Sequence, residues 1–366
     1  MIGSAAVRPQ SIVRALSALA IVVASRAVAA QDRPVLDEYK VPVITLRGED
    51  FGSQDVFASP TSIVWVDGQL IIIDRQSDPK LFVLDAKTGA IVRRFGRDGA
   101  GPGEFKAPWD IAPSGRYREF WIYDTSLRRM TLAHSDRSFT DGVFRPIRSV
   151  ALEGGANLNS VRWTAEGTFI ATGYLRRGLF AVYDSTGRER PPRGDFTYGD
   201  PRLPVFARQQ AYESRITLDP ARAKIAVAFK ESDRLEFFAS SGQRLGLAQR
   251  PFGFEPSFAM PRKRDDEYIA GTQRSRTAYR NVIATQSTVF SLFSGRRYRE
   301  FKSEAAFGRH VHVHSWDGTL RMILELDASA IAIAVDPEET VLFASVHDPV
   351  PRIVRYALPP ILRSAR

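Results

Sequence analysis

Cysteine is absent from all 366 residues of this sequence. The protein therefore forms no disulfide, uses no thiol nucleophile or thiolate metal ligand, and has no cysteine that could carry a lipid anchor. The sequence also lacks Gly-x-Ser-x-Gly, His-Glu-x-x-His and the phosphate-binding P-loop, and it has no Rossmann glycine pattern in context. We therefore predict no motif-defined catalytic residue and no cofactor.

Long apolar runs are also missing beyond residue 30, so we predict no membrane-spanning helix there. Residues 1–30 contain Arg8, Arg14 and Arg26, no acidic residue, and the largely apolar run Ala15–Ala24. The small residues Ala27-Val28-Ala29 follow this run. This order is typical of a cleaved secretory signal peptide, with an uncleaved N-terminal anchor as the alternative. We expect residues 1–30 to be the signal peptide and the protein to be periplasmic or secreted.

Acidic residues are fewer than basic ones, which gives the chain a formal net charge of +10. A basic surface attracts acidic ligands over long range but does not specify them. The excess charge is mostly arginine and is not concentrated in a basic stripe with interleaved aromatic residues. We therefore expect no nucleic-acid partner.

Short β-type segments separated by tight turns recur along the chain. In the first copy we predict strands at 60–66, 69–73, 81–84 and 90–95, with a hairpin turn at Asp67-Gly68. Equivalent first turns lie at Asp67, Ser114, Glu166, Pro220, Gln286 and Pro337. This spacing indicates a repeat array of six copies. The last copy lacks a fourth strand, and a lone strand predicted at Val35–Arg47 could supply it. No segment shows the period and caps of a helix.

The glycine-rich stretch from Phe95 to Asp110, which contains Gly-x-Gly-Pro-Gly-Glu-Phe, resembles the joint between blades in NHL-repeat and TolB-like six-bladed β-propeller proteins. Further segments resemble the TolB-like family, and they are Thr277–Thr285, Val289–Gly295, His312–Gly318 and Ile353–Pro359. The resemblance covers roughly residues 36–360. It implies export and a binding role without shared catalytic residues. Many members are lipoproteins, which this chain, having no cysteine, cannot be.

Repeats and resemblance together predict an all-β fold, a six-bladed β-propeller with four-stranded blades and a ring closed by an N-terminal strand. We expect a single propeller domain over residues 31–366. The hairpins on one face are short, and the connections on the other face are long: 96–107, 141–158, 188–213, 246–280 and 294–308. Since binding sites usually lie on such loops, we predict the site at the mouth that the long connections surround.

Several residues of this mouth are candidate binding residues for a ligand, which we expect to be an acidic small molecule or glycan. The arginines among them are Arg97, Arg176, Arg177, Arg296 and Arg297. Asp74 and Asp124 each follow a second strand and could face a substrate or cation, although such aspartates more often bond the amides of their own loop. Arginines on long loops are likewise often only solvated or ion-paired.

His310, His312 and His314 alternate along one predicted strand and therefore share a sheet face, which makes them weak candidates for a metal site. Their spacing along a single strand is strained for three ligands of one ion.

We expect a non-catalytic binding or scaffold propeller, whose partner is the acidic ligand or an envelope protein. The alternative is a propeller enzyme with its site at the central channel, either a metal-assisted lactonase or lyase or a glycan-active hydrolase. We take six apolar residues of the inner strands to face the channel, which weighs against a metal-filled channel; they are Ile63, Ile111, Val161, Ile216, Val282 and Ile333.

Overall fold

The computed structural model describes residues 40–53, 55–260, 269–272 and 274–362. These residues all belong to one compact unit, Glu38–Arg366. The predicted signal peptide, residues 1–30, lies outside the described residues. Within the part of the chain that is described, no helix is long and apolar enough to cross a membrane.

Four separate antiparallel sheets of four strands make up the first two thirds of the described chain. The first contains β3 (Pro60–Val66), β4 (Gln69–Asp74), β5 (Leu81–Asp85) and β6 (Ile91–Phe95). The second contains β7 (Pro108–Pro113), β8 (Glu119–Asp124), β9 (Arg129–His134) and β12 (Arg148–Ala151). The third contains β13 (Asn157–Trp163), β14 (Phe169–Tyr174), β15 (Phe180–Tyr183) and β16 (Glu189–Arg193). The fourth contains β17 (Ser214–Leu218), β18 (Lys224–Phe229), β19 (Leu235–Ala239) and β20 (Arg244–Leu247).

An eight-stranded sheet contains the rest of the regular strands together with the N-terminal ones. Its strands are β23 (Tyr279–Ala284), β24 (Thr288–Phe293), β25 (Gly308–Ser315), β26 (Leu320–Val335), β27 (Val341–Val346), β28 (Arg352–Ala357), β1 (Val43–Leu46) and β2 (Gly48–Asp50). The long strand β26 pairs with β25 mainly through its first half and with β27 through its second half. β1 runs parallel to the first half of β26, and β2 pairs antiparallel with β28. The strand beside β28 therefore lies just after the predicted segment Val35–Arg47.

The small elements lie in the connections between these sheets. They are β10 (Phe139–Thr140), β11 (Val143–Phe144), α2 (Val205–Ala211), β21 (Phe258–Ala259), β22 (Ala270–Gly271), α3 (Tyr298–Phe301), η1 (Lys302–Ala306) and η2 (Pro360–Leu362). The expectation of no helix is therefore wrong. The helix α2 follows Pro204, has seven residues and buries the five from Ala207 to Ala211. Two helical turns are too short to show a 3.6-residue period, and tertiary burial rather than propensity stabilises them.

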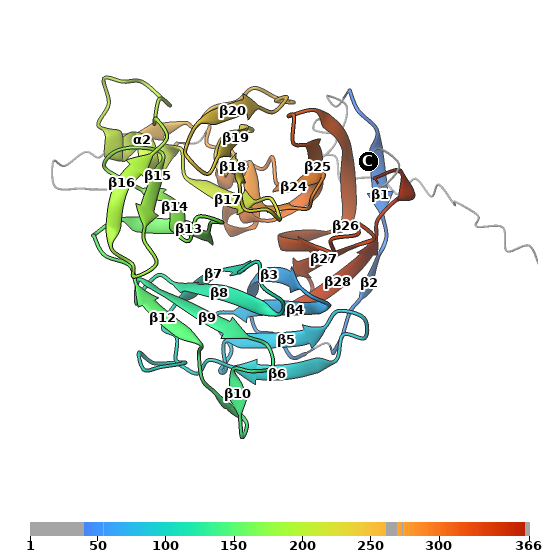
Figure 1. Ribbon diagram of the computed structural model, residues 1–366. Helices are drawn as coiled ribbons and strands as arrows, with labels where there is room; N and C mark the ends of the chain where they lie inside the picture. Colours follow the sequence, from blue (N-terminus) through green and yellow to red (C-terminus); the bar gives the residue numbers. More distant parts are fainter. Residues whose placement is uncertain (1–39, 54, 261–268, 273, 363–366) are drawn as a thin grey trace, which may run out of the picture. The chain divides into compact units, whose positions relative to one another are not determined.

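The sheets follow one another around a ring, as Figure 1 shows from blue β3 to red β28. The inner strands contact each other in the order β3, β7, β13, β17, β23 and β26, and β26 contacts β3. The protein thus has an all-β, propeller-like fold. Its hydrophobic cores lie between adjacent sheets; one, for example, joins Ile71 and Ile73 of β4 to Ile111 and Ile122 of the next sheet.

The turn chemistry of the first sheet explains its register. Asp67 and Gly68 both adopt positive φ, at 45° and 82°, between the paired residues Val66 and Gln69. A two-residue turn of this kind matches the twist of the strands that it joins. The predicted strand bounds of this sheet are confirmed to within one residue.

Candidate ligand-binding cavities of the channel

The larger cavity at the ring axis has a volume of about 560 Å³. We call it the hairpin-side cavity, because the ends of six inner strands and the turns after them line it. Its lining includes Val64, Trp65, Val66, Ala112, Pro113, Arg162, Trp163, Thr217, Leu218, Asp219, Arg222, Ile283, Thr285 and Val335. It lies on the side of the short hairpins, opposite the predicted mouth.

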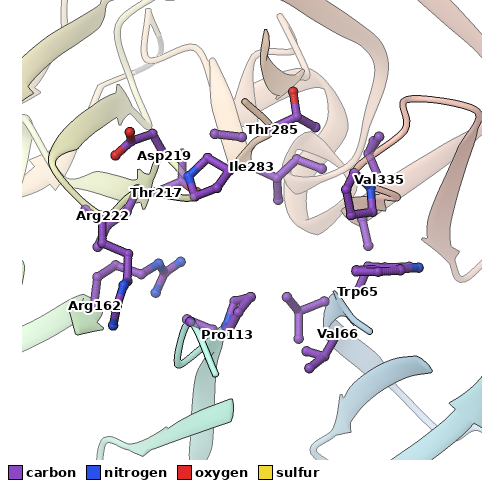
Figure 2. Close-up of a pocket in the computed structure, with 18 of the residues that line it drawn as sticks. Trp65, Val66, Pro113, Arg162, Thr217, Asp219, Arg222, Ile283, Thr285 and Val335 are labelled. Carbon is purple, nitrogen blue, oxygen red and sulfur yellow. The ribbon is translucent and has the colours of Figure 1, made fainter. Parts of the chain in front are cut away.

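Figure 2 shows that the walls of the hairpin-side cavity differ in character. Trp65, Val66 and Val335 form one side, whereas Arg162 and Arg222 lie on the other. Such a cavity offers an apolar surface and two cationic groups to the same ligand.

A smaller cavity of about 130 Å³ lies nearer the starts of the inner strands. We call it the arginine cavity, because four arginines line it: Arg75, Arg162, Arg215 and Arg280. A further hollow of about 250 Å³ shares Thr61 and Arg75 with it and reaches Lys106. The connections before β3, after β4 and before β7 line this hollow, so it opens toward the side of the predicted mouth.

The indole ring of Trp109 in β7 packs against two of the arginines that line the arginine cavity. The guanidinium carbons of Arg75 and Arg215 lie 4.8 and 4.9 Å from the centroid of its ring. The indole Nε1 donates a hydrogen bond of 3.1 Å to the carbonyl of Asn159, and Arg215 Nη1 donates one of 2.9 Å to the same oxygen. The two guanidinium groups are thus oriented without a carboxylate partner.

Arg280 is the least compensated charge of the cavity. Among the described residues it has no hydrogen-bond partner or ion-pair partner, and its Nε is buried without one. Burial, together with repulsion from Arg215, lowers the pKa of Arg280 to about 10. Glu213 attracts it, but that carboxylate is held by Lys230 at 2.9 Å and by the Tyr174 hydroxyl at 3.0 Å. Arg280 therefore remains positively charged at neutral pH and lacks a close counter-ion.

Arg162 lines both cavities and is paired with Asp110 across 2.5 Å. Asp110 is the one carboxylate in the described lining of the arginine cavity. The same carboxylate accepts the Ser160 hydroxyl at 2.9 Å and the Val161 amide at 3.0 Å. The lining as a whole carries a clear excess of positive charge, which favours an anionic ligand.

The channel-facing residues differ from those that we expected. The six apolar residues assigned to the channel are at most 5% exposed; they are Ile63, Ile111, Val161, Ile216, Val282 and Ile333. Of the six, only Val282 lines the arginine cavity, and the other neighbours that line it are Ser62, Asp110, Arg162, Arg215 and Asn281. Because side chains alternate along a strand, an error of one residue exchanges the core face for the channel face. The assignment of these residues to the channel face was therefore wrong for all but Val282, and the channel has a cationic part as well as the apolar wall of the hairpin-side cavity.

The predicted aspartates lie at the connections of the mouth, and both are fully buried. Asp74 accepts four backbone N–H groups, from Ala58, Ser59, Gln76 and Ser77, at 2.7–3.2 Å. Asp124 accepts the amides of Lys106, Ala107 and Leu127 at 2.8–3.0 Å. Each aspartate thus ties the loop after a second strand to the segment before the first strand of its own sheet.

The predicted loop arginines do not line either cavity. Arg97 is paired with Glu104 at 3.0 Å, and Arg297 lies 3.6 Å from Glu300. Arg296 stacks on Phe301 at 5.0 Å. Arg176 and Arg177 are exposed on the connection after β14.

The three histidines of β25 are buried between sheet elements, at 4% exposure or less. His312 contacts the Tyr279 hydroxyl at 3.0 Å through Nδ1 and stacks on Phe293. Burial lowers the pKa of His314 to about 4, and burial with the neighbouring histidines lowers the pKa of His312 well below its usual range. In the described part of the chain, no group of three or more His, Asp or Glu side chains is placed to hold a metal ion.

Comparison with known proteins gives a family and many solved structures of similar fold, two of which follow. The family model described as "TolB-like 6-blade propeller-like" matches residues 43–338. A crystal structure of a DUF4221 family member from Bacteroides vulgatus is similar, with TM-score 0.53, 10% identity, and coverage of 86% of this chain and 96% of that one. A protein from Bacteroides fragilis, named as an exported protein, has TM-score 0.55, 12% identity and coverage of 87% and 99%. No curated protein matches the sequence.

Proposed function

This chain belongs to the TolB-like 6-blade propeller-like family, and from that premise we propose that it is an exported, non-catalytic propeller that binds an anionic ligand in the arginine cavity. We interpret the eight-stranded sheet as two blades joined through β26, which gives six blades in all. In this interpretation β1 and β2 complete the last two blades from the N-terminal side. Export is supported by the N-terminal residues of the sequence and by the name of the Bacteroides fragilis structure.

The observation that carries the proposal is the uncompensated guanidinium of Arg280 beside Arg215. Two like charges held together without a close carboxylate destabilise the unliganded protein, and an anion between them relieves that repulsion. Arginine forks are well suited to carboxylate, phosphate and sulfate oxygens. The ligand class is therefore an acidic small molecule or an acidic sugar of a glycan.

Binding rather than turnover is favoured by the arrangement of acids in this cavity. Hydrolysis of a glycan ordinarily uses two carboxylates on either side of the scissile bond. The described lining of the arginine cavity supplies one, Asp110, and it is engaged by Arg162 and by the third sheet. In this proposal, an envelope protein is a partner only where one of its acidic groups reaches into the arginine cavity.

The test is isothermal titration of the purified protein with D-galacturonate and with its neutral counterpart D-galactose. Inorganic phosphate and sulfate serve as minimal anions. We expect saturable binding of galacturonate or of the inorganic anions that weakens as salt rises, and no binding of galactose. Arg280→Gln and Arg215→Gln should each weaken binding about tenfold, equivalent to about 1.4 kcal/mol.

The matched control is the double variant Arg176→Gln/Arg177→Gln, which removes two exposed arginines outside the cavity. It should leave the affinity within about twofold of the wild-type value. Loss of binding in the control variant with normal binding by Arg280→Gln would move the site to the long connections. Equal binding of galactose and galacturonate, or no binding of any anion, would overturn the proposal.

A further inference from the structure

The hairpin-side cavity is separate from the arginine cavity in position and in chemistry. Its lining contains the partly exposed apolar side chains Trp65, Leu218 and Ile283 at the centre of the ring. Apolar side chains gathered in a concave site, with a few polar groups at one side, are typical of a small-molecule site. The volume of about 560 Å³ is in the range of such sites.

The cationic side of this cavity is formed by Arg162 and Arg222. Arg222 donates through Nη1 to the carbonyl of Ser114 at 2.7 Å, which holds its side chain against the second sheet. No carboxylate among the described residues forms an ion pair with Arg222. Its guanidinium charge is therefore held in place across the cavity from the apolar wall and is not neutralised by an ion pair.

Two acids also line the cavity, and both are engaged in turns. Asp219 Oδ1 accepts the amides of Ala223 and Lys224 at 2.8 Å, and Asp67 Oδ2 accepts the Arg118 amide at 2.6 Å. Figure 2 shows the carboxylate of Asp219 turned away from the middle of the cavity. The side of Arg162 and Arg222 is thus the cationic one.

We propose that the hairpin-side cavity is a second binding site, for an organic acid with an apolar, ring-containing body. The ring lies against Trp65, Val66 and Val335, where aromatic stacking and burial stabilise it. The acid group faces Arg162 and Arg222 across the cavity. An apolar molecule without the acid fits the walls but leaves Arg222 without an anionic partner, and a small hydrophilic anion leaves the apolar wall uncovered.

The test uses 2-naphthoate and the neutral 2-naphthalenemethanol, titrated by calorimetry. We expect 2-naphthoate to bind about tenfold more tightly than the alcohol. Ile283→Trp places a large side chain in the cavity and should abolish binding of both compounds. Leu247→Trp, at a residue of β20 that is 42% exposed, is the matched control and should bind both normally.

Arg222→Gln should lower the affinity for 2-naphthoate to that of the alcohol, with little effect on the alcohol itself. Arg280→Gln distinguishes the two sites, because it alters only the arginine cavity and should leave 2-naphthoate binding unchanged. Binding that survives Ile283→Trp and is lost in Arg280→Gln would place the acid in the arginine cavity and overturn this proposal. If neither compound binds, the proposal is overturned as well, whatever the outcome for galacturonate.

Discussion

Arg162 of β13 and Asp110 of β7 form an ion pair of 2.5 Å between two neighbouring sheets, in the wall between the two cavities. The pair is buried, with side chains 12% and 8% exposed. Asp110 also accepts hydrogen bonds from Ser160 and Val161, so one carboxylate joins the second sheet to the third. The same carboxylate offsets part of the positive charge of the arginine cavity.

Replacing Asp110 with asparagine should therefore move stability and ligand affinity in opposite directions. Arg162 loses its counter-ion in a buried position, and we expect unfolding to become easier by about 2–4 kcal/mol. The cavity gains one unit of positive charge, so galacturonate should bind about threefold more tightly or better. Urea unfolding and calorimetry measure the two effects.

Asp200→Asn is the control for that experiment, because it removes a charge of the same sign from an exposed pair with Arg202. Both stability and affinity should change little there. An Asp110→Asn protein of lower affinity would contradict the assignment of the arginine cavity as the anion site.

Trp109 should contribute to ligand affinity although it carries no charge. Its ring orients Arg75 and Arg215, and a guanidinium on an aromatic face gains about 0.5–2 kcal/mol. Trp109→Leu should weaken anion binding about fivefold, with Arg75 and Arg215 no longer held over a ring. Trp109→Phe keeps a ring but loses the hydrogen bond to Asn159, and its affinity should lie between those of wild type and Trp109→Leu. Equal affinities for all three proteins would show that the stack is only structural.

Much of the fold follows from local sequence. The turn at Asp67-Gly68 and the alternating apolar segments around it predict the bounds of the first sheet to within one residue. The sequence also predicted long connections on one side of the ring, and the hollow that shares Thr61 and Arg75 with the arginine cavity is lined by connections of that side. These features depend on residues that are close together in the chain.

The cavity residues were missed because they depend on the phase of each inner strand. Arg162 follows Val161 directly and Arg215 precedes Ile216, so both stand beside residues that we assigned to the channel. The available signal for the cavity was that three inner strands each carry an arginine, namely Arg162, Arg215 and Arg280. A strand buried on one side and facing a channel on the other has apolar residues on its core face, and an isolated strand pattern does not identify which face is which.

Acid should destabilise the protein through the buried histidines of β25. The pKa of His314 is lowered by burial from 6.5 to about 4, and that of His312 is lowered as well. Between about pH 6.5 and pH 4 the unfolded chain therefore binds more protons than the folded one, and stability falls as the pH falls. Above about pH 6.5 the histidines are neutral in both states, so their full contribution to the stability of the folded protein is present there. Thermal unfolding midpoints measured from pH 7.5 to 4 should decline, and His314→Gln should flatten the decline. An unchanged slope in that variant would show that other groups govern the acid sensitivity.

Contact between neighbouring sheets should make Gly187 far less replaceable than Gly68. Both glycines have positive φ, at 90° and 82°, so alanine is strained at either by about 1 kcal/mol. At Gly187 a Cβ atom would lie 1.9 Å from the carbonyl oxygen of Ala151, in the adjacent sheet, whereas at Gly68 it would meet nothing within 4 Å. Because a backbone oxygen cannot rotate away, Gly187→Ala must separate the second and third sheets locally and should lower the free energy of unfolding by about 3 kcal/mol or more.

Urea unfolding of the Gly187→Ala and Gly68→Ala variants measures the difference between them. This difference isolates the packing of one sheet on the next from the conformational cost that both variants share. Equal losses would show that the sheets separate at this point without resistance.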